Sequence, residues 1–134
     1  MNSLKQEKLP ILNSSDVVLA RQKVRQWALE MKFTLVDQTK LVTAASELAR
    51  NALEHGKGGH MVIEKVVNST KDGLKLVFED QGPGIPDIET ALRDGFTSGG
   101  GMGLGLGGSK RLVNDFNIES EPGKGTRITV VRWK

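Results

Sequence analysis

Glu79-Asp80-Gln81-Gly82-Pro83-Gly84-Ile85-Pro86 is the stretch that decides the fold of this chain. An apolar run, Leu74 to Phe78, stops there at an acidic pair, and the chain breaks into glycine and proline. Glycines lack a Cβ atom, so the backbone can lie flat against a planar group, while prolines stiffen the turn. The stretch therefore predicts a strand end beside a ligand, with Asp80 holding a base; a plain surface turn is the alternative.

Length and composition bound the class of protein. The chain has 134 residues, with 19 basic and 16 acidic side chains, two histidines and no cysteine. This length suits one domain over residues 1–134, and the lack of cysteine excludes disulfides and thiolate metal sites. Basic residues are scattered without interleaved aromatics, so no nucleic-acid partner is expected. No apolar run has signal-peptide or membrane-spanning length, so we expect a cytoplasmic protein with no membrane partner.

Two helices are expected in the first half of the chain. Apolar residues recur at spacings of three and four from Val17 to Met31, after the capping residues 14–16. A second helix is predicted from about Asp37 to His55, with Gly56 ending it in the usual C-terminal position. Residues 9–12 predict a short edge strand before these helices.

The second half alternates strands with short helices. Turn-forming residues 68–73 and 122–125 each separate two apolar segments, which predicts two hairpins. Helices first and strands later indicate an α+β fold, a two-layer α/β sandwich with a mixed, mostly antiparallel sheet and helices on one face. The expected elements are strands Met61–Val67 and Leu74–Glu79, helices Asp87–Arg93 and Leu104–Phe116, and strands Ile118–Glu121 and Thr126–Trp133.

The second predicted helix carries polar residues that could do chemistry. Glu47, Asn51 and His55 are four residues apart, so they project along one stripe of the helix. A carboxylate and a carboxamide can present oxygens to magnesium, or the carboxylate can accept a proton from a hydroxyl substrate. A solvent-facing stripe is the alternative. We expect His55, at the helix end, to cap carbonyls or pack rather than bind a ligand.

A glycine-rich segment leads into the next predicted helix. The chain has 16 glycines, and seven of them fall between Gly99 and Gly108. Exposed N–H groups before a helix favour phosphate binding. The segment lacks the Gly-Lys-Ser/Thr order of a Walker A loop and the βαβ context of a Rossmann fingerprint. A flexible linker is the alternative, although linkers rarely run into an apolar-faced helix.

Four segments in this order resemble the nucleotide-binding boxes of the GHKL ATPase superfamily, which includes gyrase, Hsp90, histidine kinases and MutL. More narrowly, the short chain resembles the serine/threonine kinases of bacterial partner-switching modules, the RsbT and RsbW type, with RsbT nearer. The resemblance spans about residues 14–133. The boxes are Glu47-x-x-x-Asn51-Ala52-x-x-His55-Gly56, Asp80-Gln81-Gly82-Pro83-Gly84-Ile85-Pro86, Gly101-Met102-Gly103-Leu104-Gly105-Leu106 and Gly123-Lys124-Gly125-Thr126.

The resemblance implies a Bergerat-type ATP site and a role for each matching residue. Asp80 would accept from the adenine amine, helped by Thr126 through water, while Asn51 would hold Mg²⁺ and Glu47 would be the general base. Such kinases often carry a basic residue in the lid, and none occurs between Arg93 and Lys110. Arg50, Lys110 or Arg111 would then assist. The base would be lined by Gly82, Gly84 and Ile85, and the phosphates wrapped by Gly101, Met102, Gly103, Leu104, Gly105 and Leu106.

The resemblance also implies a substrate and partners. The expected function is an ATP-dependent serine/threonine kinase that phosphorylates a STAS-domain antagonist protein and, once released, activates a PP2C-type phosphatase. A kinase that binds a sigma factor directly is the first alternative. A nucleotide-sensing adaptor without turnover is the second. A detached histidine-kinase catalytic domain is the third, and the chain has no phosphoacceptor helix bundle to serve it.

Overall fold

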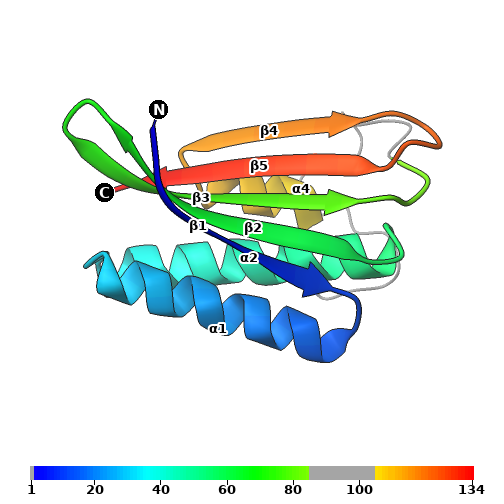
Figure 1. The fold of residues 1–134 in the computed structure, drawn as a ribbon, viewed down its shortest axis with the longest axis horizontal. Helices are drawn as coiled ribbons and strands as arrows, with labels where there is room; N and C mark the ends of the chain where they lie inside the picture. The colour runs from blue at the N-terminus through cyan, green and yellow to red at the C-terminus, as the bar shows by residue number, and fades with distance from the viewer. Residues whose placement is uncertain (1, 85–104) are drawn as a thin grey trace.

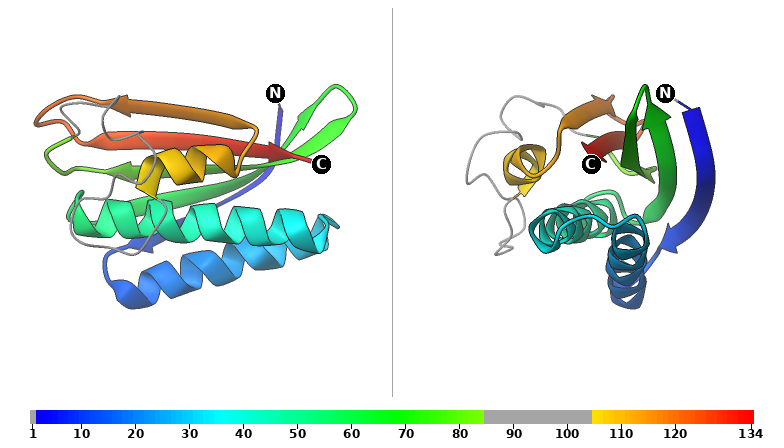
Figure 2. Two further views of the ribbon diagram at one scale, coloured as in Figure 1. Left: turned by 180° about the vertical axis from the view of Figure 1, so that it is seen from behind. Right: turned by 90° about the vertical axis from the view of Figure 1, so that its left-hand side faces the viewer.

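The computed structural model describes residues 2–84 and 105–134, so the predicted Asp87–Arg93 helix lies outside the described residues. The described residues form one five-stranded sheet in the order β1-β2-β3-β5-β4, with α1, α2 and α4 packed on one face (Figure 1). Seen end-on, the sheet curves around the helices and leaves its other face open (Figure 2). The expected α+β sandwich is confirmed, and each described strand pair is antiparallel.

The N-terminal strand is longer than its apolar residues suggest. Residues 9–12 predicted a short strand, whereas β1 runs from Asn2 to Ile11. It pairs with β2 (Gly59–Asn68) from Asn2↔Val67 to Ile11↔Gly59. The Lys5 ammonium lies 4.7 Å from the centroid of the Trp27 ring on α1, so even the polar part of β1 is held against the helices.

The central hairpin was predicted correctly but is tighter than expected. Strands β2 and β3 (Lys71–Asp80) pair up to Asn68↔Lys71, which leaves only Ser69 and Thr70 in the turn. Ser69 takes the left-handed conformation, with φ of 55°. Each strand therefore extends beyond its apolar run, and β3 ends at Asp80, one residue after the predicted end at Glu79.

The first two helices begin at side-chain caps. In α1 (Ser14–Glu30), the Asn13 side chain accepts from the Asp16 N–H over 2.9 Å. In α2 (Leu35–Glu54), the Thr34 hydroxyl accepts from the Asp37 N–H over 3.2 Å, which starts the helix two residues earlier than predicted. The apolar stripe of α2 is fully buried between α1, α4 and the sheet, and includes Leu41, Ala45, Leu48 and Ala52.

The predicted Leu104–Phe116 helix is wrong at its C-terminal end. Helix α4 covers Gly105–Arg111, and strand β4 covers Asp115–Ser120. Asn114 stops the helix because its N–H donates to the Val131 carbonyl and its side chain accepts from the Trp133 N–H. These contacts start pairing with β5 (Thr126–Trp133), and a neighbouring strand therefore overrides the helical spacing of the apolar residues.

Candidate nucleotide site

One register row brings the candidate residues to the same end of the sheet. Across β2, β3, β5 and β4, Gly59 pairs with Asp80, Asp80 with Thr126, and Thr126 with Ser120. Because side chains at one level of adjacent strands share a face, Asp80 and Thr126 both point toward the helix layer, where each is 7% exposed. The sheet therefore places a carboxylate and a hydroxyl side by side beneath the end of α2.

The carboxylate of Asp80 is buried but hydrogen-bonded. Its Oδ1 accepts from the Gly82 N–H over 3.0 Å, inside the turn that follows β3. Burial raises the pKa of the Asp80 carboxyl above 3.8, while hydrogen bonds from the Gly82 and Thr126 backbones and the charge of His55 act in the lowering direction. A buried acceptor with a raised pKa favours a ligand that donates a hydrogen bond to it.

Ser120 is a site residue that the sequence reading missed. Its hydroxyl lies 2.9 Å from the Thr126 hydroxyl and donates to the Gly125 carbonyl over 3.1 Å. Thr126 is thus oriented by its cross-strand neighbour. The signal was present in the alternation of β4, which puts Ser120 on the same face as Phe116 and Ile118, but it requires the register with β5 to be known.

Two glycine turns pack against each other beside Asp80. The Gly123 N–H donates to the Pro83 carbonyl over 2.8 Å, which joins the turn after β3 to the turn between β4 and β5. Gly84 has a φ of 80°, and a Cβ there would lie 2.9 Å from the Glu121 carbonyl carbon. Glycine is therefore required at this position both by conformation and by space. The glycine-containing turn after β3 is therefore held on one side by the turn between β4 and β5.

Gly56 directly follows the end of α2, as predicted, but without the left-handed conformation that is usual for a helix-ending glycine. Helix α2 ends at Glu54 with His55 as its C-cap, the Gly56 N–H donates to the Asn51 carbonyl over 3.4 Å, and the residue that takes a left-handed conformation is Lys57, with φ of 59°. The φ of Gly56 lies outside the left-handed range. A Cβ on Gly56 would instead come within 2.5 Å of the Asp80 Oδ2 atom. The glycine is needed because Asp80 occupies the space of a side chain.

The last turns of α2 carry the other candidate residues. Asn51 is half-buried, and its carbonyl accepts from the His55 N–H over 2.9 Å, so His55 caps the helix as expected. Glu47 lies one turn earlier, about 6 Å along the helix axis from Asn51. Its side chain is 16% exposed, and its Oε1 atom lies 3.4 Å from Arg50 Nη1. Along α2, Asn51 is therefore nearer to the Asp80 end than Glu47 is.

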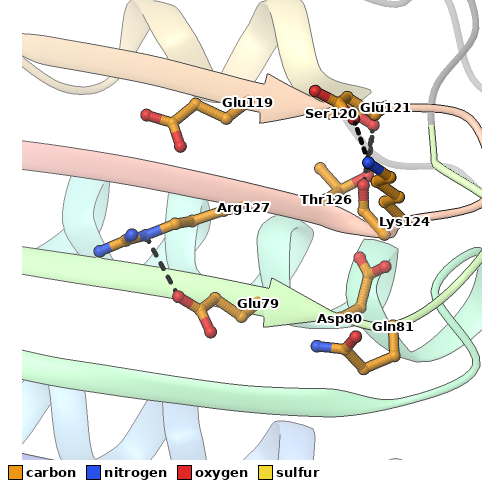
Figure 3. A pocket seen from close by; sticks show the side chains of 10 residues that line it. Glu79, Asp80, Gln81, Glu119, Ser120, Glu121, Lys124, Thr126 and Arg127 are labelled. Carbon is orange, nitrogen blue, oxygen red and sulfur yellow. Dashed lines mark hydrogen bonds and ion pairs between the residues drawn. The ribbon is translucent and has the colours of Figure 1, made fainter.

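A hollow of about 450 Å³ opens at the ends of β3, β4 and β5, and Glu47 and Asn51 do not line it. Figure 3 shows Glu79, Arg127 and Glu119 in a row across these strands, on the face away from the helices. Arg127 Nε lies 3.2 Å from Glu79 Oε1, and His60 Nε2 lies 3.3 Å from Glu79 Oε2. These ion pairs lie along the outer side of the hollow, and Asp80, Ser120 and Thr126 also line it, so it reaches the candidate site at the strand ends.

The remaining predicted site residues divide into two groups. Gly105 opens α4, and Leu106 is 6% exposed within the hydrophobic core. Their proposed contact with phosphates stays a prediction. The others lie outside the described residues: Ile85, Gly101, Met102, Gly103 and Leu104.

The described residues fit a purine nucleotide better than a tightly held metal. A buried carboxylate acceptor, an ordered hydroxyl and glycine-containing turns meet at one end of the sheet, and they suit a flat base that donates an N–H. Among the described residues, no three His, Cys, Asp or Glu side chains gather as a metal cluster. Asn51 offers one amide oxygen, which suits a magnesium ion bound mainly by phosphate oxygens.

None of the described helices combines the length and the apolar character that a membrane-spanning segment needs.

Comparison with known proteins places this geometry in a family. A family model described as histidine kinase-, DNA gyrase B- and HSP90-like ATPase matches residues 36–134. The serine/threonine-protein kinase RsbT of Bacillus subtilis is 47% identical over 123 residues, covering 92% of each chain. An anti-sigma F factor of Clostridium kluyveri is 33% identical over 122 residues, covering 88% of this chain and 86% of the relative.

Solved structures share the fold at lower identity. The RsbU and RsbW domains of a Mycobacterium tuberculosis protein superpose with a TM-score of 0.62 at 19% identity, covering 98% of this chain and 33% of that one. The mycobacterial sensor histidine kinase MprB superposes with a TM-score of 0.57 at 21% identity, covering 96% of this chain and 97% of that one. The fold of this chain therefore recurs in both structures.

Proposed function

This chain belongs to the histidine kinase-, DNA gyrase B- and HSP90-like ATPase family and is a homologue of the serine/threonine kinase RsbT, and from that premise we propose that it phosphorylates a STAS-domain antagonist protein. Membership of this family implies that the chain binds ATP. The observation that carries the proposal is the buried carboxylate of Asp80, held beneath the end of the helix that bears Asn51 and Glu47.

The base-recognition role rests on Asp80 and Thr126. The Asp80 carboxylate accepts a hydrogen bond from the exocyclic amine of adenine. The burial of Asp80 excludes water that would compete for this hydrogen bond. The Thr126 hydroxyl, oriented by Ser120, completes recognition through a water molecule. Gly82, Gly84 and Ile85 line the base, since the glycines leave room for a flat ring beside the backbone.

The transfer chemistry is assigned to α2. Phosphoryl transfer depends mainly on positioning and on neutralising charge, which ATP-bound magnesium supplies in part. The side-chain oxygen of Asn51 holds that ion, and Glu47 accepts the proton of the incoming serine or threonine hydroxyl. Arg50 pairs with Glu47 over 3.4 Å, which supports Arg50 as a source of positive charge beside the reacting groups. Lys110 and Arg111 are further candidates for this charge, and the proposed role of residues 101–106 is to wrap the phosphates as a lid.

Partner switching follows from the relatives. An RsbT homologue implies a partner-switching module. In the proposed cycle the kinase phosphorylates its STAS-domain antagonist, is released from it, and then binds and activates a PP2C-type phosphatase. Direct binding of a sigma factor is the second candidate, because an anti-sigma F factor is 33% identical to this chain.

The deciding experiment asks whether phosphate reaches a protein serine or threonine. The purified chain is used as bait in pull-downs with and without ATP, and bound STAS proteins are mapped for phosphorylation by mass spectrometry. Transfer is then repeated with the two purified proteins. New phosphoserine or phosphothreonine on the STAS protein supports the proposal. ATP binding without any transfer favours a nucleotide-sensing adaptor, and recovery of a sigma factor alone favours the second candidate.

A further inference from the structure

The Asp80 carboxylate rests against backbone where a side chain would normally stand. A Cβ on Gly56 would lie 2.5 Å from Asp80 Oδ2, and a Cβ on Gly82 would lie 2.5 Å from Gly56 Cα. A Cβ on Gly125 would lie 3.0 Å from the Asp80 carbonyl carbon. Three glycines from three separate segments thus surround this residue, and we call them the Asp80 socket.

Within the socket, Gly56 is the glycine at which an added Cβ would collide with the functional carboxylate itself. Gly125 approaches the main chain of Asp80 and has a φ of 85°, so its backbone conformation already favours glycine. Gly56 lies outside the left-handed range, where alanine would be the better residue for a fixed backbone. Its lack of a side chain is therefore explained by the space that Asp80 fills, and not by a left-handed backbone conformation.

Three contacts fix the side chain of Asp80. The Gly82 N–H holds Oδ1 over 3.0 Å, Gly56 lies against Oδ2, and the residue as a whole is 7% exposed. Interiors are close-packed, so an added methyl group at Gly56 must displace the carboxylate or the end of α2. Either movement separates the acceptor from the base of a bound nucleotide.

We infer that Gly56 is a positioning residue for nucleotide recognition. Because it has no side chain, the Asp80 carboxylate can pack directly against its Cα, and this contact fixes the position of the carboxylate. This inference rests on the proposed function, because it takes Asp80 as the acceptor for adenine. Asn51 and Glu47 lie more than one and more than two turns earlier in the sequence of α2, so a change at Gly56 acts first on base binding and only weakly on the transfer step.

The binding test uses Gly56→Ala with ADP as the probe, measured by calorimetry in magnesium buffer. Loss of one well-placed, charge-assisted hydrogen bond predicts a Kd about 10-fold to 100-fold higher. Ser69→Ala is the control, since Ser69 is exposed and has a φ of 55° in the turn between β2 and β3, at the opposite end of the sheet from Asp80. It alters a turn residue in a left-handed conformation without touching the site, and its Kd should match that of the wild type.

A kinetic split separates positioning from damage to the whole site. In Gly56→Ala, KM for ATP should rise in step with the ADP Kd, while kcat at saturating ATP stays near the wild-type value. A fall in kcat with unchanged KM would overturn the inference. If the wild type itself bound no ADP, the proposed function would fail first, and the stability test below would still decide whether Gly56 and Asp80 are coupled.

That stability test is a double-mutant cycle followed by urea unfolding. Gly56→Ala should lower the unfolding midpoint of the wild type, but lower it much less in an Asp80→Gly background, where the carboxylate and its Cβ are gone. If the single variant does not fold and the double variant does, the coupling is demonstrated. Equal losses in both backgrounds, failure of both to fold, or a raised midpoint for Gly56→Ala would overturn the inference.

Discussion

Arg132, near the end of β5, donates a hydrogen bond from Nη2 to the Asp37 carboxylate over 2.6 Å, across 95 positions of sequence. Its Nη1 donates to the Leu112 carbonyl over 3.0 Å, at the end of α4. One guanidinium thus ties the start of α2 to the end of α4 and to the sheet. The Arg132 side chain is 15% exposed and that of Asp37 is 27% exposed, so water screens the pair only in part.

Asp37→Asn should lower the free energy of unfolding by about 1–3 kcal/mol, because it leaves a mostly buried guanidinium without its anion. The Arg132 hydrogen bond holds the pKa of the Asp37 carboxyl below 3.8 in the folded protein. The stabilisation is therefore present above pH 3.8 and is lost as the pH falls through the lowered folded value.

Urea unfolding at several pH values checks this prediction. The difference between wild type and Asp37→Asn should be constant near neutral pH and should shrink in acid. Glu30→Gln is a suitable control, since that exposed carboxylate only accepts from Gln26 over 3.3 Å. A difference that grows as the pH falls would contradict the assignment.

Asp80→Asn should raise the ADP Kd by about 10-fold or more, because an amide NH₂ turned toward the adenine amine would oppose a donor with a donor. Burial raises the pKa of the Asp80 carboxyl, so this carboxylate takes up a proton more readily as the pH is lowered. Wild-type ADP affinity should therefore begin to fall, on acidification, at a pH above the ordinary aspartate range. Calorimetric titrations across pH measure both effects.

The sign for stability is opposite to that for Asp37. A carboxyl whose folded pKa is raised stabilises the fold below its unfolded pKa, and this contribution is lost as the pH rises through the folded value.

Glu79→Gln is the matched control for ADP binding, because the Glu79 carboxylate lies on the other face of β3 and pairs with Arg127. Equal loss of affinity in both variants would argue against base recognition by Asp80.

Glu47→Gln should reduce phosphoryl transfer by about 100-fold to 10,000-fold, the range expected for loss of a general base. Its ADP Kd should stay near the wild-type value because Glu47 lies two turns of α2 from the Asp80 end. Single-turnover transfer to the STAS substrate measures the loss. Glu54→Gln, on the same helix and exposed, should transfer normally. Wild-type transfer by Glu47→Gln would exclude it as the base.

Asn51→Ala should weaken ADP binding about 10-fold in magnesium buffer and leave binding unchanged in EDTA. The reason is that only the side-chain oxygen is removed, while the Asn51 carbonyl still accepts from the His55 N–H and keeps the helix end intact. Calorimetry in the two buffers makes the comparison internal to one variant. Equal weakening with and without magnesium would point to a structural role for Asn51.

The sequence by itself determined the order of the site segments and most of the element types. The apolar run before Asp80 and the glycines after it marked a strand end, and the four-residue spacing of Glu47 and Asn51 marked one helix stripe. Both are local signals, because backbone conformation and helical period depend on neighbours in sequence. The two-layer fold followed from the same order of elements.

Only the tertiary structure decided which residues meet. The pairing of β4 with β5 turned Phe116 from a predicted helix residue into a strand residue and set Ser120 beside Thr126. The packing of the end of α2 against the end of β3 placed Gly56 against the Asp80 side chain, where a larger residue would not fit. The physical reason is that strand register and close packing are contacts between distant segments, and no local pattern of residue types encodes the space that one side chain leaves for another.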